Sequence, residues 1–169
     1  MKNIVLTGFM GAGKTTIGKA LAKMLHMKLV DVDEEIEISR KMTINDIFKM
    51  YGEPYFRDIE TAMIKKLSHN KNCIISTGGG AVLRDENMEA LKENGVVFCL
   101  AASAETILER TGNNQDRPLL KVENPKKKIE ELLAYRRPFY EKAGIMIETD
   151  GKTPLQIAEE IMELYKCRK

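Results

Sequence analysis

A glycine-rich segment near the amino terminus carries the strongest chemical signal in the sequence. The residues Gly8-Phe9-Met10-Gly11-Ala12-Gly13-Lys14-Thr15 fit the phosphate-loop pattern G-x-x-x-x-G-K-[ST]. Glycines let backbone N–H groups turn towards a phosphate, Lys14 supplies a charge for the β- and γ-phosphates, and the Thr15 hydroxyl suits Mg²⁺. The pattern predicts nucleotide binding. The residues expected to bind the nucleotide are Gly11, Ala12, Gly13, Lys14, Thr15 and Thr16.

Two carboxylates at the end of the second predicted strand form a further candidate group. Asp31 and Asp33 are two residues apart, so they project on the same side while the strand persists. In doubly wound sheets the carboxyl ends of the strands line the ligand crevice, which brings this pair near the phosphate loop. There a carboxylate can hold metal-bound water or orient an attacking hydroxyl. The alternative is a pair of solvent-facing acids that begin a helix, followed by Glu34 and Glu35.

Three consecutive glycines close the third predicted strand. Gly78, Gly79 and Gly80 follow Thr77, and they can form a tight turn and nothing more. They can also let backbone N–H groups approach a ligand closely. The residues alone leave both interpretations open.

Three arginines are candidates for binding an anion. Arg57 has Glu53 at i−4 and Glu60 at i+3, so its own surroundings favour an exposed ion-pair cluster on a helix. Arg136 instead continues an apolar helical stripe, where an unpaired guanidinium is costly unless it meets an anion such as a carboxylate. Arg117 is either an internal arginine finger for phosphoryl transfer or a solvated loop residue.

Five short apolar runs are expected to form the strands that position these residues. They alternate with helical periodicity, which indicates βα units around a parallel sheet. The runs are Ile4–Leu6, Leu29–Asp31, Cys73–Ser76, Val96–Leu100 and Ile145–Ile147.

Helices are expected directly after the phosphate loop and as an inserted pair between the second and third strands. The first helix begins near Lys14. The inserted pair begins with a capping box at Thr43, is interrupted at Gly52 and resumes at Pro54. Because two helices exceed a minimal crossover, the substrate pocket is expected at this insertion, in the segment of about 33–61.

The carboxyl-terminal part of the chain is expected to hold a lid and two or three helices. Ser103 can cap a helix that runs to about Arg110, and the aperiodic stretch of about 112–124 is expected to be a lid. A helix with the apolar stripe that leads to Arg136 follows. The last helix begins at Thr153-Pro154 and is expected to pack through Leu155, Ala158, Ile161 and Leu164.

Bulk composition is that of an ordinary globular protein and names no function. A chain of 169 residues suits one domain, 1–169, and a formal net charge of +2 gives no reason to expect a nucleic-acid partner. The three cysteines form no CxxC pair, and no stretch has the features of a signal peptide or a membrane span. These observations predict a cytoplasmic protein without a membrane partner. No exposed interaction stripe is evident, which favours a monomer.

Six features taken together resemble the shikimate kinase family in order and spacing, from about Lys2 to the final helix. They are the phosphate loop, Asp31-Val32-Asp33, Phe56-Arg57, Gly78-Gly79-Gly80, Arg117-Pro118-Leu119-Leu120 and Arg136. The resemblance implies an α/β, three-layer P-loop kinase fold: a five-stranded parallel sheet flanked by helices, with a substrate-binding helical insertion and a lid. It also implies transfer of the γ-phosphoryl group of MgATP to the 3-hydroxyl of shikimate in aromatic amino-acid biosynthesis.

The resemblance also implies a role for each candidate residue. On the nucleotide side, Lys14 would bind phosphates, Thr15 would bind Mg²⁺, and Asp31 would bind the water shell of the metal. On the substrate side, Asp33 would bind the reacting hydroxyl. Shikimate would further be bound by Phe48, Phe56, Arg57, Gly78, Gly79, Gly80 and Arg136, with Arg110 against adenine and Arg117 closing over ATP.

Two alternative functions remain open from the sequence. One is another small-metabolite kinase on the same scaffold, for example one that acts on gluconate, which is also a carboxylated polyol. The other is a nucleotide-dependent regulatory module without turnover.

Overall fold

The computed structural model describes residues 2–111 and 123–168, and within them the chain forms a five-stranded parallel sheet in the order β2-β3-β1-β4-β5. The sequence predicts all five strands, and the structure confirms them with small extensions at their ends. The strands are β1 Asn3–Gly8, β2 Lys28–Asp31, β3 Cys73–Ser76, β4 Gly95–Ala101 and β5 Ile145–Glu148.

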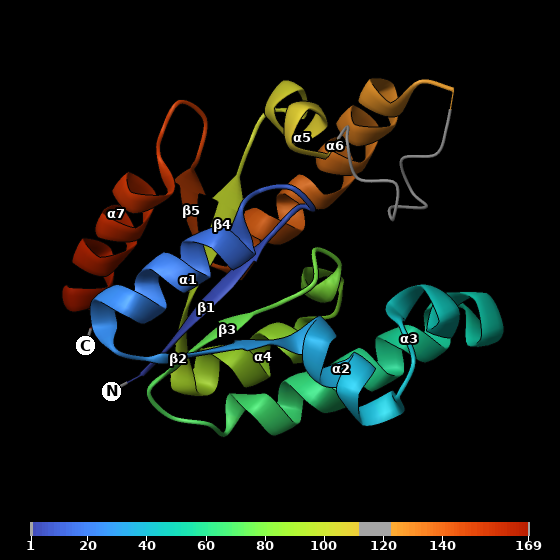
Figure 1. Ribbon diagram of the computed structural model, residues 1–169, viewed down its shortest axis with the longest axis horizontal. Coiled ribbons are helices and arrows are strands. Elements are labelled where there is room, and N and C mark those ends of the chain that lie inside the picture. The colour runs from blue at the N-terminus through green and yellow to red at the C-terminus, as the bar shows by residue number, and fades with distance from the viewer. Residues whose placement is uncertain (1, 112–122, 169) are drawn as a thin grey trace.

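Helices connect and cover these strands (Figure 1). They are α1 Lys14–Leu25, α2 Val32–Arg40, α3 Ile44–Ser68, α4 Asp85–Asn94, α5 Ala104–Thr111, α6 Pro125–Ala143 and α7 Pro154–Lys166, with a short 3₁₀ helix at Ala81–Leu83. The helix α4 is not predicted from the sequence, because it contains few apolar residues. Among the residues that the structure describes, no helix has both the length and the apolar character needed to cross a membrane.

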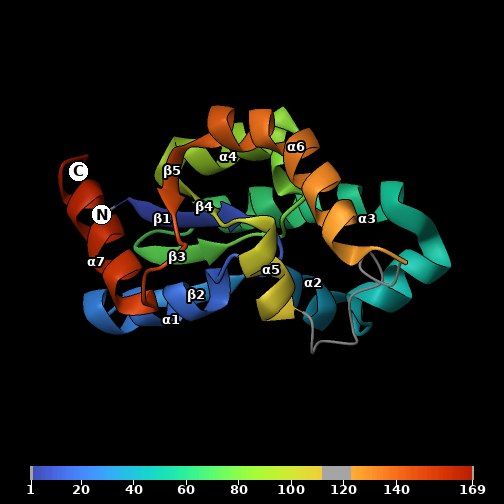
Figure 2. The ribbon, with the colours of Figure 1, turned by 90° about the horizontal axis from the view of Figure 1, so that it is seen from above.

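The sheet is the middle of three layers, because alternate side chains of each strand point to opposite faces. On β1, Ile4 and Leu6 pack against α1 and α7, whereas Val5 packs in the cluster that includes α3, α4 and α6. Figure 2 shows α1 and α7 on one side of the sheet and α4 and α6 on the other. Every residue of β1 is buried, as expected for a parallel strand covered on both faces.

The inserted helical pair forms the single element α3, in which a kink at Gly52 separates the two helical segments. In α3, Gly52 has φ 79° and ψ 173°, and Thr43 caps the amino terminus by accepting a hydrogen bond from the Asp46 N–H at 3.1 Å. The dihedral angles of Gly52 lie in a region that essentially only glycine adopts. The predicted interruption at Gly52 and the restart near Pro54 are therefore confirmed as a change of direction within α3.

Two expectations at the level of single residues are wrong. Leu155 does not pack in the core but is 54% exposed, whereas Ile157 and Tyr165 fill the inner face of α7. Asp31 and Asp33 do not share a strand face, because β2 ends at Asp31 and α2 begins with the next residue. The first buried residue of α7 is Ile157, two positions after Leu155.

Strand order brings the candidate segments together at one edge of the sheet. The phosphate loop follows β1, Asp31 ends β2 and the three glycines follow β3, and β1 lies next to β3 in the sheet. All five strands are parallel, so their carboxyl ends meet at this edge. In Figure 1, α2 and α3 extend from one side of this edge and α5 and α6 from the other.

Candidate active site

The phosphate loop has the backbone conformation that its glycines predict. Gly13 is the N-cap of α1 with φ 96°, and no side chain caps the helix. The loop therefore leaves the first N–H groups of α1 available for an anion, and the helix dipole adds a partial positive charge there. Lys14 Nζ donates hydrogen bonds to the Gly8 carbonyl at 2.6 Å and the Phe9 carbonyl at 3.0 Å, so its charge lies within the loop.

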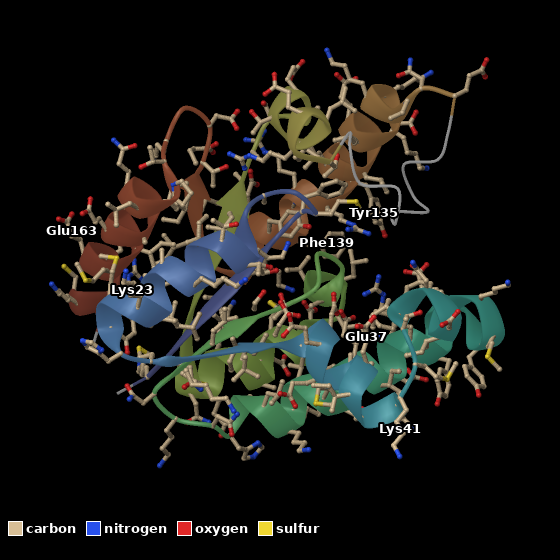
Figure 3. The ribbon with its side chains drawn as sticks, in the orientation of Figure 1. Lys23, Glu37, Lys41, Tyr135, Phe139 and Glu163 are labelled. Atoms are coloured by element: carbon tan, nitrogen blue, oxygen red, sulfur yellow. The ribbon has the colours of Figure 1, made fainter. Side chains whose placement is uncertain are left out.

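A cavity of about 1090 Å³ opens beside this loop. Figure 3 shows Glu37 on α2 and Tyr135 on α6, two residues that line the cavity from different helices. The predicted site residues that line it are Gly11, Gly13, Lys14, Thr15, Thr16, Asp31, Asp33, Phe48, Arg57, Gly78, Gly79, Arg110 and Arg136. Residues from six separate segments of the chain thus converge on one space.

Asp31 and Asp33 reach the cavity in different ways. Asp31 is the N-cap of α2, and its Oδ1 accepts hydrogen bonds from the N–H groups of Asp33 at 3.0 Å and Glu34 at 3.4 Å. Asp33 belongs to the first turn of α2 and lines the cavity. The alternative interpretation of acids that begin a helix is therefore correct for the backbone, yet both carboxylates face the cavity.

The surroundings of the Asp33 carboxyl disfavour its ionised form. Its Oδ1 atom is buried and has no hydrogen-bond partner in the part of the chain that the structure describes. Burial, followed by the charges of Asp31 and Glu60, raises the pKa of Asp33 to about 7, against the lowering effect of Lys14 and Arg57. A carboxyl that titrates near neutral pH can accept or release a proton under working conditions.

Glu60 is a site residue that the sequence analysis treated only as a surface partner of Arg57. It is 0% exposed, and a Cβ on Gly78 would lie 3.0 Å from its Oε1 and 3.2 Å from the Asp33 Oδ1. Burial raises the pKa of Glu60, against the lowering effect of Arg57. The i+3 spacing from Arg57 was the only signal in the sequence, and it could not distinguish a buried partner from an exposed one.

Arg57 is paired and also lines the cavity. Its guanidinium contacts Glu60 Oε2 at 2.7 Å and Glu53 Oε1 at 3.1 Å, and its side chain is 14% exposed. A Cβ on Gly80 would collide with this guanidinium. The absence of a side chain at Gly80 therefore lets the Arg57 guanidinium lie close to the backbone, although Gly80 itself does not line the cavity.

Arg136 is buried, as the apolar stripe of its helix predicts. It is 7% exposed, its guanidinium lies 5.5 Å from the centre of the Phe9 ring, and its Nε has no partner among the described residues. In that part of the chain it forms no ion pair with a carboxylate within 4.0 Å. A buried guanidinium in this state is suited to bind an anionic ligand.

Two predicted aromatic contacts differ in their access to the cavity. Phe48 lines the cavity, whereas Phe56 is 3% exposed and does not line it. The two rings pack against each other with centroids 4.7 Å apart. Phe56 therefore supports Phe48 from behind, and Ala12 in the phosphate loop is likewise buried away from the cavity.

Arg110 lies against the phosphate loop. Its Nη1 donates a hydrogen bond to the Gly11 carbonyl at 3.2 Å, and it lines the cavity. Arg117 and most of the expected lid of about 112–124 lie outside the described residues. Asn124, the last residue of that stretch, caps α6 by accepting a hydrogen bond from the Lys127 N–H at 3.1 Å.

The fold and the site together define the class of the protein. A phosphate loop between β1 and α1, a parallel sheet with its crevice at the carboxyl ends, and a carboxylate beside the loop are the parts of a P-loop phosphotransferase. The buried guanidinium in the same cavity indicates an anionic acceptor.

Comparisons with known proteins identify the family. A family model described as shikimate kinase matches residues 10–166. The shikimate kinase of Thermodesulfovibrio yellowstonii is 55% identical over 166 residues, which cover 98% of this chain and 96% of that protein. A solved structure, "Shikimate kinase from Acinetobacter baumannii in complex with shikimate", is 40% identical with a TM-score of 0.94, and the match covers 100% of this chain and 95% of that one.

The chain belongs to the shikimate kinase family. It is a kinase of the shikimate pathway, which confirms the interpretation of the six sequence features and of the P-loop kinase fold. The gluconate kinase alternative and the non-catalytic alternative are not supported.

Proposed function

We propose that the enzyme transfers the γ-phosphoryl group of MgATP to the 3-hydroxyl of shikimate, giving shikimate 3-phosphate and ADP. The observation that carries this proposal is the placement of Arg136. A buried guanidinium without a carboxylate partner among the described residues shares one cavity with the phosphate loop and with Asp33. Shikimate offers a carboxylate to the Arg136 guanidinium and a hydroxyl to Asp33. The Acinetobacter baumannii relative is described as a complex with shikimate.

The nucleotide side of the cavity supports phosphate binding by the loop. Gly11 to Thr16 would surround the phosphates, Lys14 would neutralise them, and Arg110 would lie against adenine. Thr15 is exposed at the first turn of α1 and lines the cavity, and Asp31 has only its Oδ1 engaged as a cap. This donor set of one hydroxyl and one carboxylate fits Mg²⁺, which usually keeps several waters.

Mg²⁺ held by Thr15, and through water by Asp31, would offset negative charge on the phosphates. Arg117 would add a further positive charge over ATP. The transition state of phosphoryl transfer is stabilised mainly by positioning and charge, so no covalent intermediate with a residue of this chain is needed.

The acceptor side supports a role for Asp33 in orienting the reacting hydroxyl. Its enclosed Oδ1 has no partner among the described residues, so it can accept a hydrogen bond from a substrate hydroxyl. Arg57, Arg136 and the glycines Gly78 and Gly79 would bind the rest of shikimate, with Phe48 against its ring. The segment of about 33–61 within the single domain 1–169 would then be the substrate-binding segment. We also propose that the enzyme acts as a cytoplasmic monomer.

The first experiment measures ADP release from MgATP by the purified protein with shikimate, gluconate, nucleoside monophosphates or no acceptor. Stimulation by shikimate alone is expected. Stimulation by a different acceptor would contradict the assignment of the cavity to shikimate. The assignment of the phosphate loop to ATP would still stand.

A substitution at Asp33 tests its role within this function. We expect Asp33→Asn to reduce kcat by about 10²- to 10⁴-fold, the range typical of a lost acid–base group, and to leave the Kd of ATP unchanged. Unchanged turnover would refute the role of Asp33.

A further inference from the structure

Tyr140 is a buried residue that connects two parts of the substrate side. It lies on α6 one turn after Arg136 and is 5% exposed. Its hydroxyl donates a hydrogen bond of 2.7 Å to the carbonyl of Gly79, which is 61 residues away in the sequence. Neither its position in the sequence nor the six family features single out this residue.

The charge of Arg136 also acts on the Tyr140 hydroxyl. Burial raises the pKa of Tyr140 to about 12, against the lowering effect of the Arg136 charge. The hydroxyl therefore keeps its proton at neutral pH and remains a donor. Gly79 lies close by, since a Cβ on it would be 3.5 Å from Arg136 Nη1 and 3.1 Å from the carbonyl oxygen of Gly8.

The geometry of a peptide unit gives this contact a consequence for ligand binding. The carbonyl of Gly79 and the N–H of Gly80 belong to one planar trans peptide, so they point in opposite directions. Fixing the carbonyl on Tyr140 therefore fixes the plane of this peptide and with it the position of Gly79, which lines the cavity. Within residues 2–111 and 123–168, Gly79 does not donate its N–H to a protein acceptor, so this N–H remains for a ligand.

We propose that Tyr140 is a positioning residue for the acceptor substrate. Its hydroxyl holds the carbonyl of Gly79 close to the Arg136 guanidinium, so that the Gly79 N–H and the guanidinium meet the substrate at a fixed separation. The inference rests on the proposed function and deepens it. Without this contact, the backbone of the glycine turn would follow the same course. The plane of the Gly79–Gly80 peptide would, however, no longer be held by α6.

The experiment compares wild type with Tyr140→Phe in steady-state kinetics and in calorimetric binding of shikimate. Both the KM and the Kd of shikimate are expected to rise about tenfold, the effect of a disturbed hydrogen bond to a charged group. The kcat and the KM of ATP are expected to stay within about twofold, because the contact acts in ground state and transition state alike.

Tyr165→Phe is the matched control. Tyr165 is 1% exposed on α7, and its hydroxyl also donates to a backbone carbonyl, that of Lys2. Both variants remove one buried tyrosine hydroxyl, so a lower melting temperature is expected for both. Only Tyr140→Phe should weaken shikimate binding. An unchanged shikimate KM in Tyr140→Phe, with a lowered melting temperature, would reduce Tyr140 to a structural residue and overturn the proposal.

An observation on the wild type alone tests the proposal independently of how the variant folds. The amide resonance of Gly79 should shift when shikimate is added to ¹⁵N-labelled protein, and no shift would overturn the proposal. If the wild type turns over shikimate while either of these tests fails, only the role of Tyr140 is lost. If the wild type does not turn over shikimate, the proposed function fails first, and this inference with it.

Discussion

At the scale of single residues, the two arginines of the cavity differ in how their charge is compensated. Arg57 pairs with Glu53 and Glu60, so much of its charge is neutralised before any ligand binds. Arg136 is buried and has no carboxylate partner among the described residues. Removing the partner of a buried charge is costly, and supplying one is correspondingly favourable. A substrate carboxylate should therefore depend more on Arg136 than on Arg57.

We expect Arg136→Ala to raise the KM of shikimate about thirtyfold or more, because truncating one member of a buried charge pair costs at least about 2 kcal/mol. The KM of ATP should not change. The neighbouring Arg137→Ala is the control, since the Arg137 side chain is 76% exposed and pairs only with the surface residue Glu141. Equal shikimate KM values for both variants would contradict the carboxylate role.

The raised pKa of Asp33 predicts a pH dependence of stability in the ligand-free protein. Its folded pKa is about 7 and its ordinary pKa is 3.8, so between these values the folded state binds more protons than the unfolded state. The stability contributed by Asp33 is then fully present below the lower value and is lost as the pH rises through about 7.

Urea denaturation of wild type and Asp33→Asn at pH 5, 6, 7 and 8 measures this effect. The variant cannot ionise at this position, so its free energy of unfolding relative to wild type should increase with pH and level off above pH 8. A difference that is constant over this range would show that Asp33 is not perturbed. A ¹³C titration of the Asp33 carboxyl in the free protein provides the pKa directly.

At the scale of elements, the kink in α3 determines where the substrate-binding segment points. Phe48 lies before the kink and Arg57 after it, and both line the cavity. A straight helix of this length would carry these two side chains along one continuous axis. The change of direction at Gly52 is therefore part of the geometry of the site, although Gly52 itself is not among the residues that line the cavity.

Gly52→Ala should lower the free energy of unfolding by about 1–3 kcal/mol, because φ 79° with ψ 173° is strained for any residue with a Cβ. The added Cβ would meet only Pro54 Cδ at 3.7 Å, so the cost comes from the backbone and not from a clash. Urea denaturation measures it. Met50→Ala, at a position that is 64% exposed, is expected to stay within about 0.5 kcal/mol of wild type.

At the scale of the whole molecule, the two proposed substrates would bind to different parts of one sheet edge. The nucleotide side is built from the loop after β1 together with α1 and α5, whereas the acceptor side is built from α2, α3, the turn after β3 and α6. Each ligand should therefore stabilise the fold by its own contacts. The same division lets a substitution on one side leave the other ligand unaffected.

Thermal and urea denaturation with each ligand separately test this division. At a concentration 100 times its Kd, either MgADP or shikimate should raise the free energy of unfolding by about 2.7 kcal/mol. In Arg136→Ala, the same concentration of shikimate should give a much smaller increase while the effect of MgADP is retained. Loss of both effects would indicate that Arg136 maintains the fold and does not select the acceptor.

The sequence by itself determined the features that depend on neighbours along the chain. The phosphate loop, the five strands and the kink at Gly52 are each specified by a run of adjacent residues, because backbone conformation responds first to local glycines, prolines and apolar periodicity. The burial of Arg136 followed from its place in a helical stripe for the same reason. The family resemblance added the roles of these residues, which no local pattern contains.

Only the tertiary structure decided which residues share a buried environment. From the sequence, Glu60 and Arg57 are both expected to belong to a surface ion-pair cluster. In the structure Glu60 is completely buried beside Gly78, in the turn after β3. The contact of Tyr140 with Gly79 joins residues from α6 and from the turn after β3. Burial, pKa and long-range hydrogen bonds depend on distances in space, and a sequence pattern records only distances along the chain.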